Sequence, residues 1–192
     1  MKNKKISGLL YTAVMGVAVL SLASCAEKKF RVSGTITQAK DSVLYLENMS
    51  LNGPKAVDSV KLDENGNFEF KQKAPDAPEF YRLRIANQMV NLAVDSTESI
   101  TVKAAYPTMS ANYEVSGSEE CTKIRDLAYM QLELQTHVAA IANSSSLGVQ
   151  AVEDSVAKVL EVYKNKVKLN YIFKEPMKAY AYYALFQTIV LG

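Results

Sequence analysis

This 192-residue chain has two cysteines and one histidine, whose thiol and imidazole groups can act as nucleophiles or metal ligands. Cys25 and Cys121 lie far apart in the sequence, and neither belongs to a Cys-x-x-Cys pair. His137 has no second His or Cys three or four residues away, whereas a structural zinc site needs about four such ligands in close spacing. We therefore expect no metal, no cofactor and no catalytic constellation within this chain.

Cys121 keeps two interpretations. It follows Glu119 and Glu120 at the predicted start of a helix, where the helix dipole could lower the pKa of a thiol and support a redox sensor. Alternatively, it is a small apolar residue packed beneath a sheet. The two glutamates do not indicate acid-base chemistry, because adjacent helical residues point about 100° apart and a position near the helix start explains them.

The segment 63–67 carries oxygen ligands at alternating positions, as a calcium loop does. Its glycine stands in the wrong place for such a loop, and no acidic residue occupies the twelfth position. The Asn65-Gly66 pair between two alternating runs instead predicts a β-hairpin turn. The serines at 144–146 are typical of a linker, and the alternating lysines Lys164, Lys166 and Lys168 are explained either by an ordinary solvated face or by contact with anionic lipid.

The first 25 residues have the layout of a secretory signal. Three lysines precede an apolar run over 6–20, which is shorter than the roughly 20 residues that span a bilayer. The ending Leu22-Ala23-Ser24-Cys25 resembles the bacterial lipobox. The resemblance implies cleavage between Ser24 and Cys25, and lipidation of Cys25. Alternatively, Cys25 simply follows an ordinary signal or an uncleaved anchor helix.

The charge balance changes once the signal is set aside. The whole chain has 22 basic and 20 acidic residues, for a formal net charge of +2. Without the three lysines of the signal, 19 basic residues face 20 acidic ones, and the net charge is about −1. We expect no nucleic-acid partner, because no basic patch remains to bind one.

An apolar period of two extends from Lys28 to about Ser116 and predicts roughly eight short strands. Turn residues separate the strands, and no helical pattern intervenes, so we expect an antiparallel β-sandwich or a partly open barrel. Helical spacing begins after Ser118, a predicted N-cap, and continues to a second helix after Gly148. Pro176 predicts a third helix over 177–191 that is apolar on nearly every face and must be buried on nearly every face.

The predicted fold class is therefore α+β, with a β-sandwich followed by a helical hairpin and a third short helix. The expected divisions are a lipoprotein signal peptide over 1–24, a β-domain over 25–117 and a helical region over 118–192. We also expect the chain to be an N-terminal piece of a longer protein, because the apolar last helix calls for a covering surface.

The whole pattern resembles a known family. Its features are the lipobox, strand sequences at 30–36 and 43–46, the 58–70 segment with its Asn-Gly turn, the Tyr81-Arg82-Leu83 strand, and the 115–118 segment that leads into helices. These features are similar to the β-rich domain of unknown function at the N-terminus of many Gram-negative envelope lipoproteins. That domain is commonly followed by helices and a thioredoxin-like redoxin domain with a Cys-x-x-Cys pair, which this chain lacks.

The resemblance implies a lipid-anchored module of the bacterial envelope that faces the periplasm. We expect it to act as a spacer, docking or binding domain without its own catalytic site. The expected partners are the membrane and a redoxin domain, or another protein, packed on the 177–191 helix. Two alternatives stay open: the N-terminal part of a thiol-disulfide oxidoreductase whose catalytic domain lies outside this chain, and a lipoprotein that binds a small molecule or a glycan.

Overall fold

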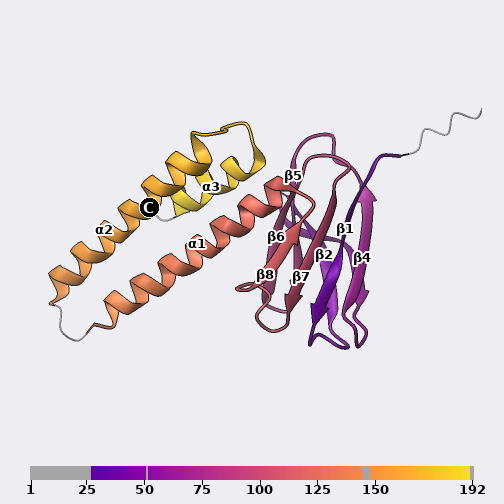
Figure 1. Cartoon of the computed structure of the whole chain (residues 1–192), viewed down its shortest axis with the longest axis horizontal. Coiled ribbons are helices and arrows are strands. Elements are labelled where there is room, and N and C mark those ends of the chain that lie inside the picture. Colours follow the sequence, from indigo (N-terminus) through magenta and orange to yellow (C-terminus); the bar gives the residue numbers. More distant parts are fainter. Residues whose placement is uncertain (1–26, 51, 145–147, 191–192) are drawn as a thin grey trace, which may run out of the picture.

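The computed structural model describes residues 27–50, 52–144 and 148–190 (Figure 1). In this part of the chain, eight strands form two four-stranded sheets, ordered β4-β1-β7-β8 and β3-β2-β5-β6. The strands are β1 (Lys29–Thr37), β2 (Val43–Ser50), β3 (Gly53–Lys61), β4 (Asn67–Lys73), β5 (Glu79–Ile85), β6 (Gln88–Val94), β7 (Ser99–Ala105) and β8 (Tyr113–Ser116). The predicted α+β class and the sandwich arrangement are confirmed, and the sheets do not close into a barrel.

One hydrophobic core lies between the two sheets. Alternate residues of β1, such as Phe30 and Val32, point inward, and they meet inward-facing residues of the other sheet, such as Leu44 and Leu83. All four side chains are fully buried. The period-two pattern of the sequence therefore reports the faces of the sandwich directly, because one face of each sheet packs on the core and the other faces outward.

The predicted hairpin at Asn65-Gly66 is wrong, although the turn itself is present. Asp63 Oδ1 accepts hydrogen bonds from the backbone N–H groups of Asn65 and Gly66, each at 2.9 Å. The strands on either side do not pair, because β3 pairs with β2 and β4 pairs with β1 in the other sheet. The turn therefore links the edges of two sheets, a role that local sequence does not distinguish from a hairpin.

The sandwich also departs from a purely antiparallel pattern. β1 pairs with β7 in the parallel direction, and this pair places Gly34 opposite Val102. A Cβ atom at Gly34, whose φ is +151°, would lie 1.7 Å from the carbonyl oxygen of Val102. Glycine is therefore required where these two central strands approach each other.

Three helices and a π-helical turn follow the sandwich. They are α1 (Glu119–Ala142), α2 (Val149–Val167), η1 (Lys168–Ile172) and α3 (Ala179–Val190). The predicted N-cap of α1 is confirmed, since Ser118 Oγ accepts the Cys121 N–H at 3.3 Å. α1 and α2 extend away from the sandwich as the predicted antiparallel pair, and α3 lies against both of them (Figure 1). α3 begins three residues after Pro176, which lies in a turn, so the predicted start at residue 177 is two residues early.

Candidate docking face and polar cavity

The helices join the sandwich where an edge strand of each sheet would otherwise be uncovered. The first half of α1 packs on β6 and β8, the edge strands on that side of the two sheets. Ala93 of β6, Ile124 of α1 and Tyr180 of α3 belong to one buried cluster there. Covering an edge in this way prevents it from pairing with other chains, and it also fixes the helices relative to the sandwich.

Glu120 holds α3 against α1. Its side chain is 10% exposed, and its Oε2 accepts the backbone N–H of Tyr180 at 2.8 Å, at the first turn of α3. Burial raises the pKa of this carboxyl, while the Tyr180 N–H and the nearby Lys178 ammonium oppose the rise. The sequence explains Glu119 and Glu120 by their position at the start of α1. This is incomplete for Glu120, whose carboxylate binds the N-terminus of α3, whereas Glu119 is exposed.

α3 presents an exposed apolar face. The sequence predicts a helix that is buried on nearly every face once a covering surface from outside this chain is in place, and the described residues bury only one side of it. Its buried side contains Ala181 and Ala184, but five large side chains are between 44% and 67% exposed: Tyr182, Leu185, Phe186, Ile189 and Val190. Residues 182, 185, 186 and 189 recur at spacings of three and four, so they form one face of the helix. We call these five residues the α3 face.

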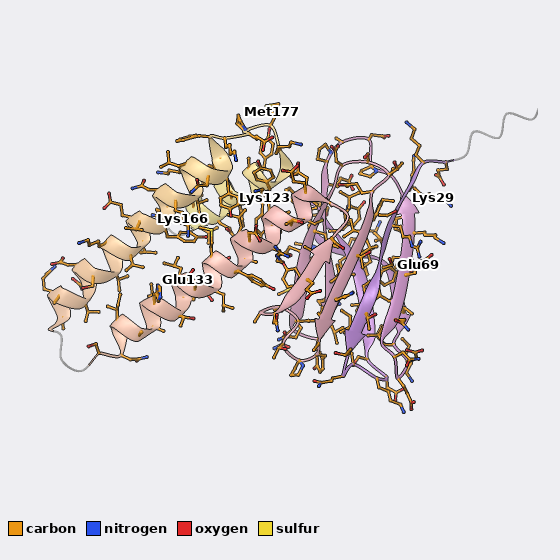
Figure 2. The ribbon with its side chains drawn as sticks, viewed as in Figure 1. Lys29, Glu69, Lys123, Glu133, Lys166 and Met177 are labelled. Atoms are coloured by element: carbon orange, nitrogen blue, oxygen red, sulfur yellow. The ribbon has the colours of Figure 1, made fainter. Side chains whose placement is uncertain are left out.

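An apolar cavity of about 380 Å³ continues the α3 face onto the sandwich. It lies between α3 and the outer side of the β2 and β5 sheet, and its lining includes Met49, Phe80, Tyr182 and Phe186. The Phe80 and Tyr183 rings, whose centroids are 6.3 Å apart, both line this cavity. On the same side of the molecule as the helices, Met177 projects from the turn before α3 and is 81% exposed (Figure 2).

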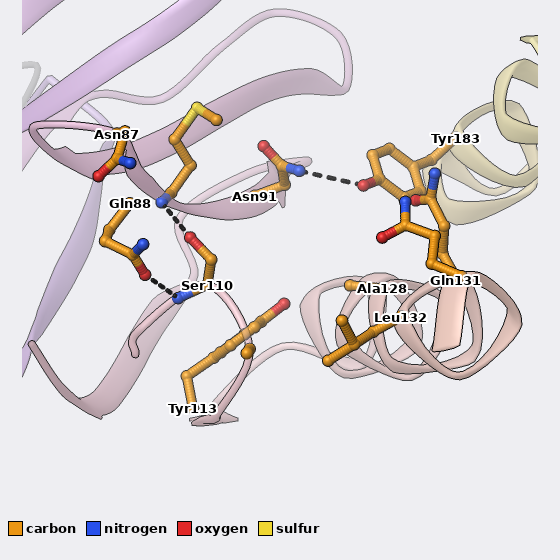
Figure 3. A pocket seen from close by; sticks show the side chains of 12 residues that line it. Asn87, Gln88, Asn91, Ser110, Tyr113, Ala128, Gln131, Leu132 and Tyr183 are labelled. Carbon is orange, nitrogen blue, oxygen red and sulfur yellow. Dashed lines mark hydrogen bonds between the residues drawn. The ribbon is translucent and has the colours of Figure 1, made fainter. Parts of the chain in front are cut away.

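A second cavity, of about 450 Å³, lies between β6, the loop before β8, and α1 (Figure 3). Amides, hydroxyls and a few apolar side chains line it, and none of its lining residues is charged. Asn91 Nδ2 donates to the hydroxyl of Tyr183 at 3.0 Å, and Ser110 Oγ accepts the Met89 N–H at 2.6 Å. The lining is formed by four separate segments, so no local motif in the sequence could have indicated this cavity. We call it the polar cavity.

Cys121 is fully buried at the start of α1, and its Sγ donates to the carbonyl oxygen of Ala93 at 3.2 Å. Burial raises the pKa of this thiol to about 11. The helix dipole does not lower the pKa of Cys121 below its ordinary value, because desolvation of the thiolate is the larger effect. The position matches the interpretation of Cys121 as a small packed residue and not the one that makes it a redox sensor.

The other candidate site residues named from the sequence are not brought together into one site. His137 is exposed on α1. Asp63 is engaged by backbone N–H groups of its own turn. Within the described ranges, no three His, Cys, Asp or Glu side chains gather as a metal site would require. The predicted lipidation residue Cys25 and the cleavage position at Ser24 lie outside the described residues, as does most of the 144–146 linker.

The β-rich part of the chain matches a known protein family. Residues 30–123 match a family described as a domain of unknown function, DUF4369. This segment belongs to the DUF4369 family. The match covers the sandwich from residue 30 onward and the first turn of α1, so it confirms that the β-rich part resembles a domain of unknown function. The comparison with known families detects no redoxin domain in this chain. No curated protein matches the sequence.

The DUF4369 segment ends within α1, and the rest of the helical region lies beyond the match. The polar cavity therefore combines β6 and β8 of the DUF4369 domain with parts of α1 and α3 that follow it. Among the residues that the structure describes, no helix is both long enough and apolar enough to span a bilayer.

Proposed function

We propose that the chain is a membrane-anchored envelope lipoprotein module that docks another protein domain and has no catalytic site of its own. Acyl chains on Cys25 would hold it at a membrane, since several chains on one residue give stable anchoring. The support for this part is the Leu22-Ala23-Ser24-Cys25 sequence after a cationic and apolar leader. The module faces the periplasm in this proposal.

The observation that carries the docking role is the α3 face. Burial of a large apolar side chain contributes about 1.5–3 kcal/mol, so covering Leu185, Phe186 and Ile189 alone would favour association by several kcal/mol before its costs. The face adjoins the apolar cavity, which offers a recess for a projecting side chain. A contiguous apolar surface of this kind is typical of a protein interaction site.

Rigid attachment supports the same role. Glu120 and the cluster around Ile124 and Tyr180 fix α3 to α1 and to β6, so the α3 face has a defined orientation relative to the sandwich. A tether at Cys25 and a fixed face at α3 would together set both the location and the orientation of a docked domain. In the alternative in which the chain is part of a thiol-disulfide oxidoreductase, a redoxin domain is the docked unit.

Site-specific photo-cross-linking in cells tests the docking role. A photoreactive phenylalanine replaces Phe186, which is 66% exposed, and in a control it replaces Phe173, which is 67% exposed but lies outside α3. We expect one discrete cross-linked product from position 186, mapped by mass spectrometry to another folded domain, and little from position 173. Equal products from both positions, or none from position 186, would contradict the docking role.

A binding role for a small molecule or glycan is favoured by a different observation, the polar cavity. Its volume of about 450 Å³ falls within the range of ligand sites, and its lining combines apolar groups with several hydrogen-bonding ones. This role is compatible with membrane anchoring and with docking at α3, because the cavity and the α3 face expose different residues.

A further inference from the structure

Among the described residues, the Tyr113 hydroxyl at the polar cavity has no hydrogen-bond partner. The side chain is 4% exposed, and its hydroxyl points into the space bounded by Asn91, Ser110 and Ala128 (Figure 3). Its backbone is fully engaged with Tyr129, whose hydroxyl accepts the Tyr113 N–H at 2.8 Å and donates to the Tyr113 carbonyl at 2.5 Å. No hydrogen bond to the Tyr113 hydroxyl itself is found among the described residues.

Within the described residues every buried side-chain nitrogen or oxygen has a hydrogen-bond partner, so the Tyr113 hydroxyl, which has none, is open to the cavity although the rest of the residue is buried. Burial also raises the pKa of Tyr113, so the hydroxyl stays protonated and is available as a donor at neutral pH. The hydroxyl is therefore suited to donate to an acceptor that occupies the cavity.

The amide groups around Tyr113 extend the same chemistry. Asn91 uses its Nδ2 on Tyr183, and Gln131 uses its Oε1 to accept from Gln187 at 2.9 Å. The carbonyl oxygen of Asn91 and the amide nitrogen of Gln131 remain for a ligand. These two groups and the Tyr113 hydroxyl together supply both an acceptor and donors.

The edge of β6 beside the cavity cannot pair with a peptide as a further strand. Two hydrogen bonds already occupy the outer edge of β6. Toward one end Ser110 Oγ accepts the Met89 N–H, and toward the other Cys121 Sγ donates to the Ala93 carbonyl oxygen. Only the backbone of Asn91 between them faces the cavity, because outward-facing backbone groups alternate along an edge strand. A peptide therefore cannot add to β6 as a further strand, and a compact ligand suits the site better.

The lining also determines the charge of the ligand. With no Asp, Glu, Lys, Arg or His in contact with the cavity, a charged ligand would be desolvated without a counter-charge. Met89 on β6 and Ala128 and Leu132 on α1 add apolar side chains to the lining. A sugar ring fits this combination, because it has an apolar C–H face and a rim of hydroxyls.

We propose that the polar cavity binds a neutral, hydroxyl-rich sugar unit and that the Tyr113 hydroxyl donates a hydrogen bond to it. This inference deepens the small-molecule or glycan alternative, and it depends neither on the anchor at Cys25 nor on docking at α3. A Cys25→Ala variant should therefore bind the sugar as the unaltered chain does, even if the anchoring proposal fails.

Saturation-transfer NMR with the full chain in detergent tests the proposal, with glucose and N-acetylglucosamine as neutral probes and glucuronate as a charged match. We expect transfer to at least one neutral probe and little to glucuronate. Transfer to neither neutral probe, or equal transfer to glucose and glucuronate, would overturn the proposal.

Matched variants locate the site. Tyr113→Phe removes only the unpartnered hydroxyl, so we expect an unchanged melting temperature and a dissociation constant raised about threefold to tenfold, as for the loss of one hydrogen bond. Tyr45→Phe makes the same change on the outer side of β2, away from the cavity, and should leave binding unaltered. Ala128→Leu fills the cavity without removing a hydrogen bond and should abolish binding. Binding that survives both Tyr113→Phe and Ala128→Leu would refute the site.

Discussion

Replacement of Glu120 by Ala is expected to release α3 from α1. The substitution removes the carboxylate that accepts the Tyr180 N–H at 2.8 Å and leaves that buried donor without a partner. A hydrogen bond to a charged group contributes about 1.5–3 kcal/mol, and a negative charge at a helix N-terminus adds about 0.3–1 kcal/mol. The burial that raises the pKa of Glu120 offsets part of this, so we expect a net loss of about 1.5–3 kcal/mol.

Glu119→Ala is the matched control, because Glu119 is the adjacent residue, is exposed and also lies in the first turn of α1. We expect it to cost about 0.5 kcal/mol or less. Urea unfolding of the full chain gives the free energies, and hydrogen exchange measured on peptides from 179–190 reports whether α3 is still protected. If both variants unfold at the same urea concentration and α3 exchanges equally slowly in both, Glu120 does not hold α3 and the reasoning is refuted.

Three further results are expected. Gly34→Ala should destabilise the sandwich by about 3 kcal/mol or more, because the added Cβ clashes with Val102. In the control Gly148→Ala the added Cβ meets no atom within 4 Å, so the unfolding free energy should change by less than about 0.5 kcal/mol. Equal effects of the two substitutions would contradict the close approach of β1 and β7. Burial raises the pKa of Glu47, but hydrogen bonds from two arginines outweigh it and hold the pKa below the ordinary value of 4.5. These bonds stabilise the fold at pH values above 4.5, and the stabilisation is lost as the pH falls through the depressed pKa. The difference in unfolding free energy between the unaltered chain and Glu47→Gln should therefore narrow in acid, and a constant difference would contradict this. Peptide mapping after maleimide treatment at neutral pH should find Cys121 unmodified in the folded chain and modified in urea, and rapid modification of the folded chain would contradict its burial.

The strands could be predicted from the sequence because burial on a sheet alternates along the chain. Phe30, Val32, Phe68 and Phe70 all point into the core, as their spacing indicates. The pairing of strands could not be predicted in the same way. The Asn65-Gly66 turn has the local chemistry of a hairpin, but it leads from the edge of one sheet to the edge of the other, and only the complete sandwich determines this.

The helical region shows the same limit. The composition of α3 predicts burial on nearly every face, but composition alone does not distinguish Ala184, which is fully buried within the chain, from Phe186, which is exposed. The role of Glu120 also depended on a residue 60 positions away in the sequence, the N–H of Tyr180. The alternating pattern places Tyr113 in a strand, but its access to a cavity depends on α1 and β6, which lie beside it only in the folded chain.

Attachment through Cys25 is tested most directly by fractionation of cells that express the unaltered chain or the Cys25→Ala variant. We predict that the unaltered chain sediments with membranes and is extracted by detergent, and that the variant no longer sediments with the membranes. Tyr45→Phe, which leaves the lipobox intact, should sediment as the unaltered chain does. Retention of Cys25→Ala in the membrane fraction, to the same extent as the unaltered chain, would contradict the lipid anchor and with it the proposal of a membrane-anchored module.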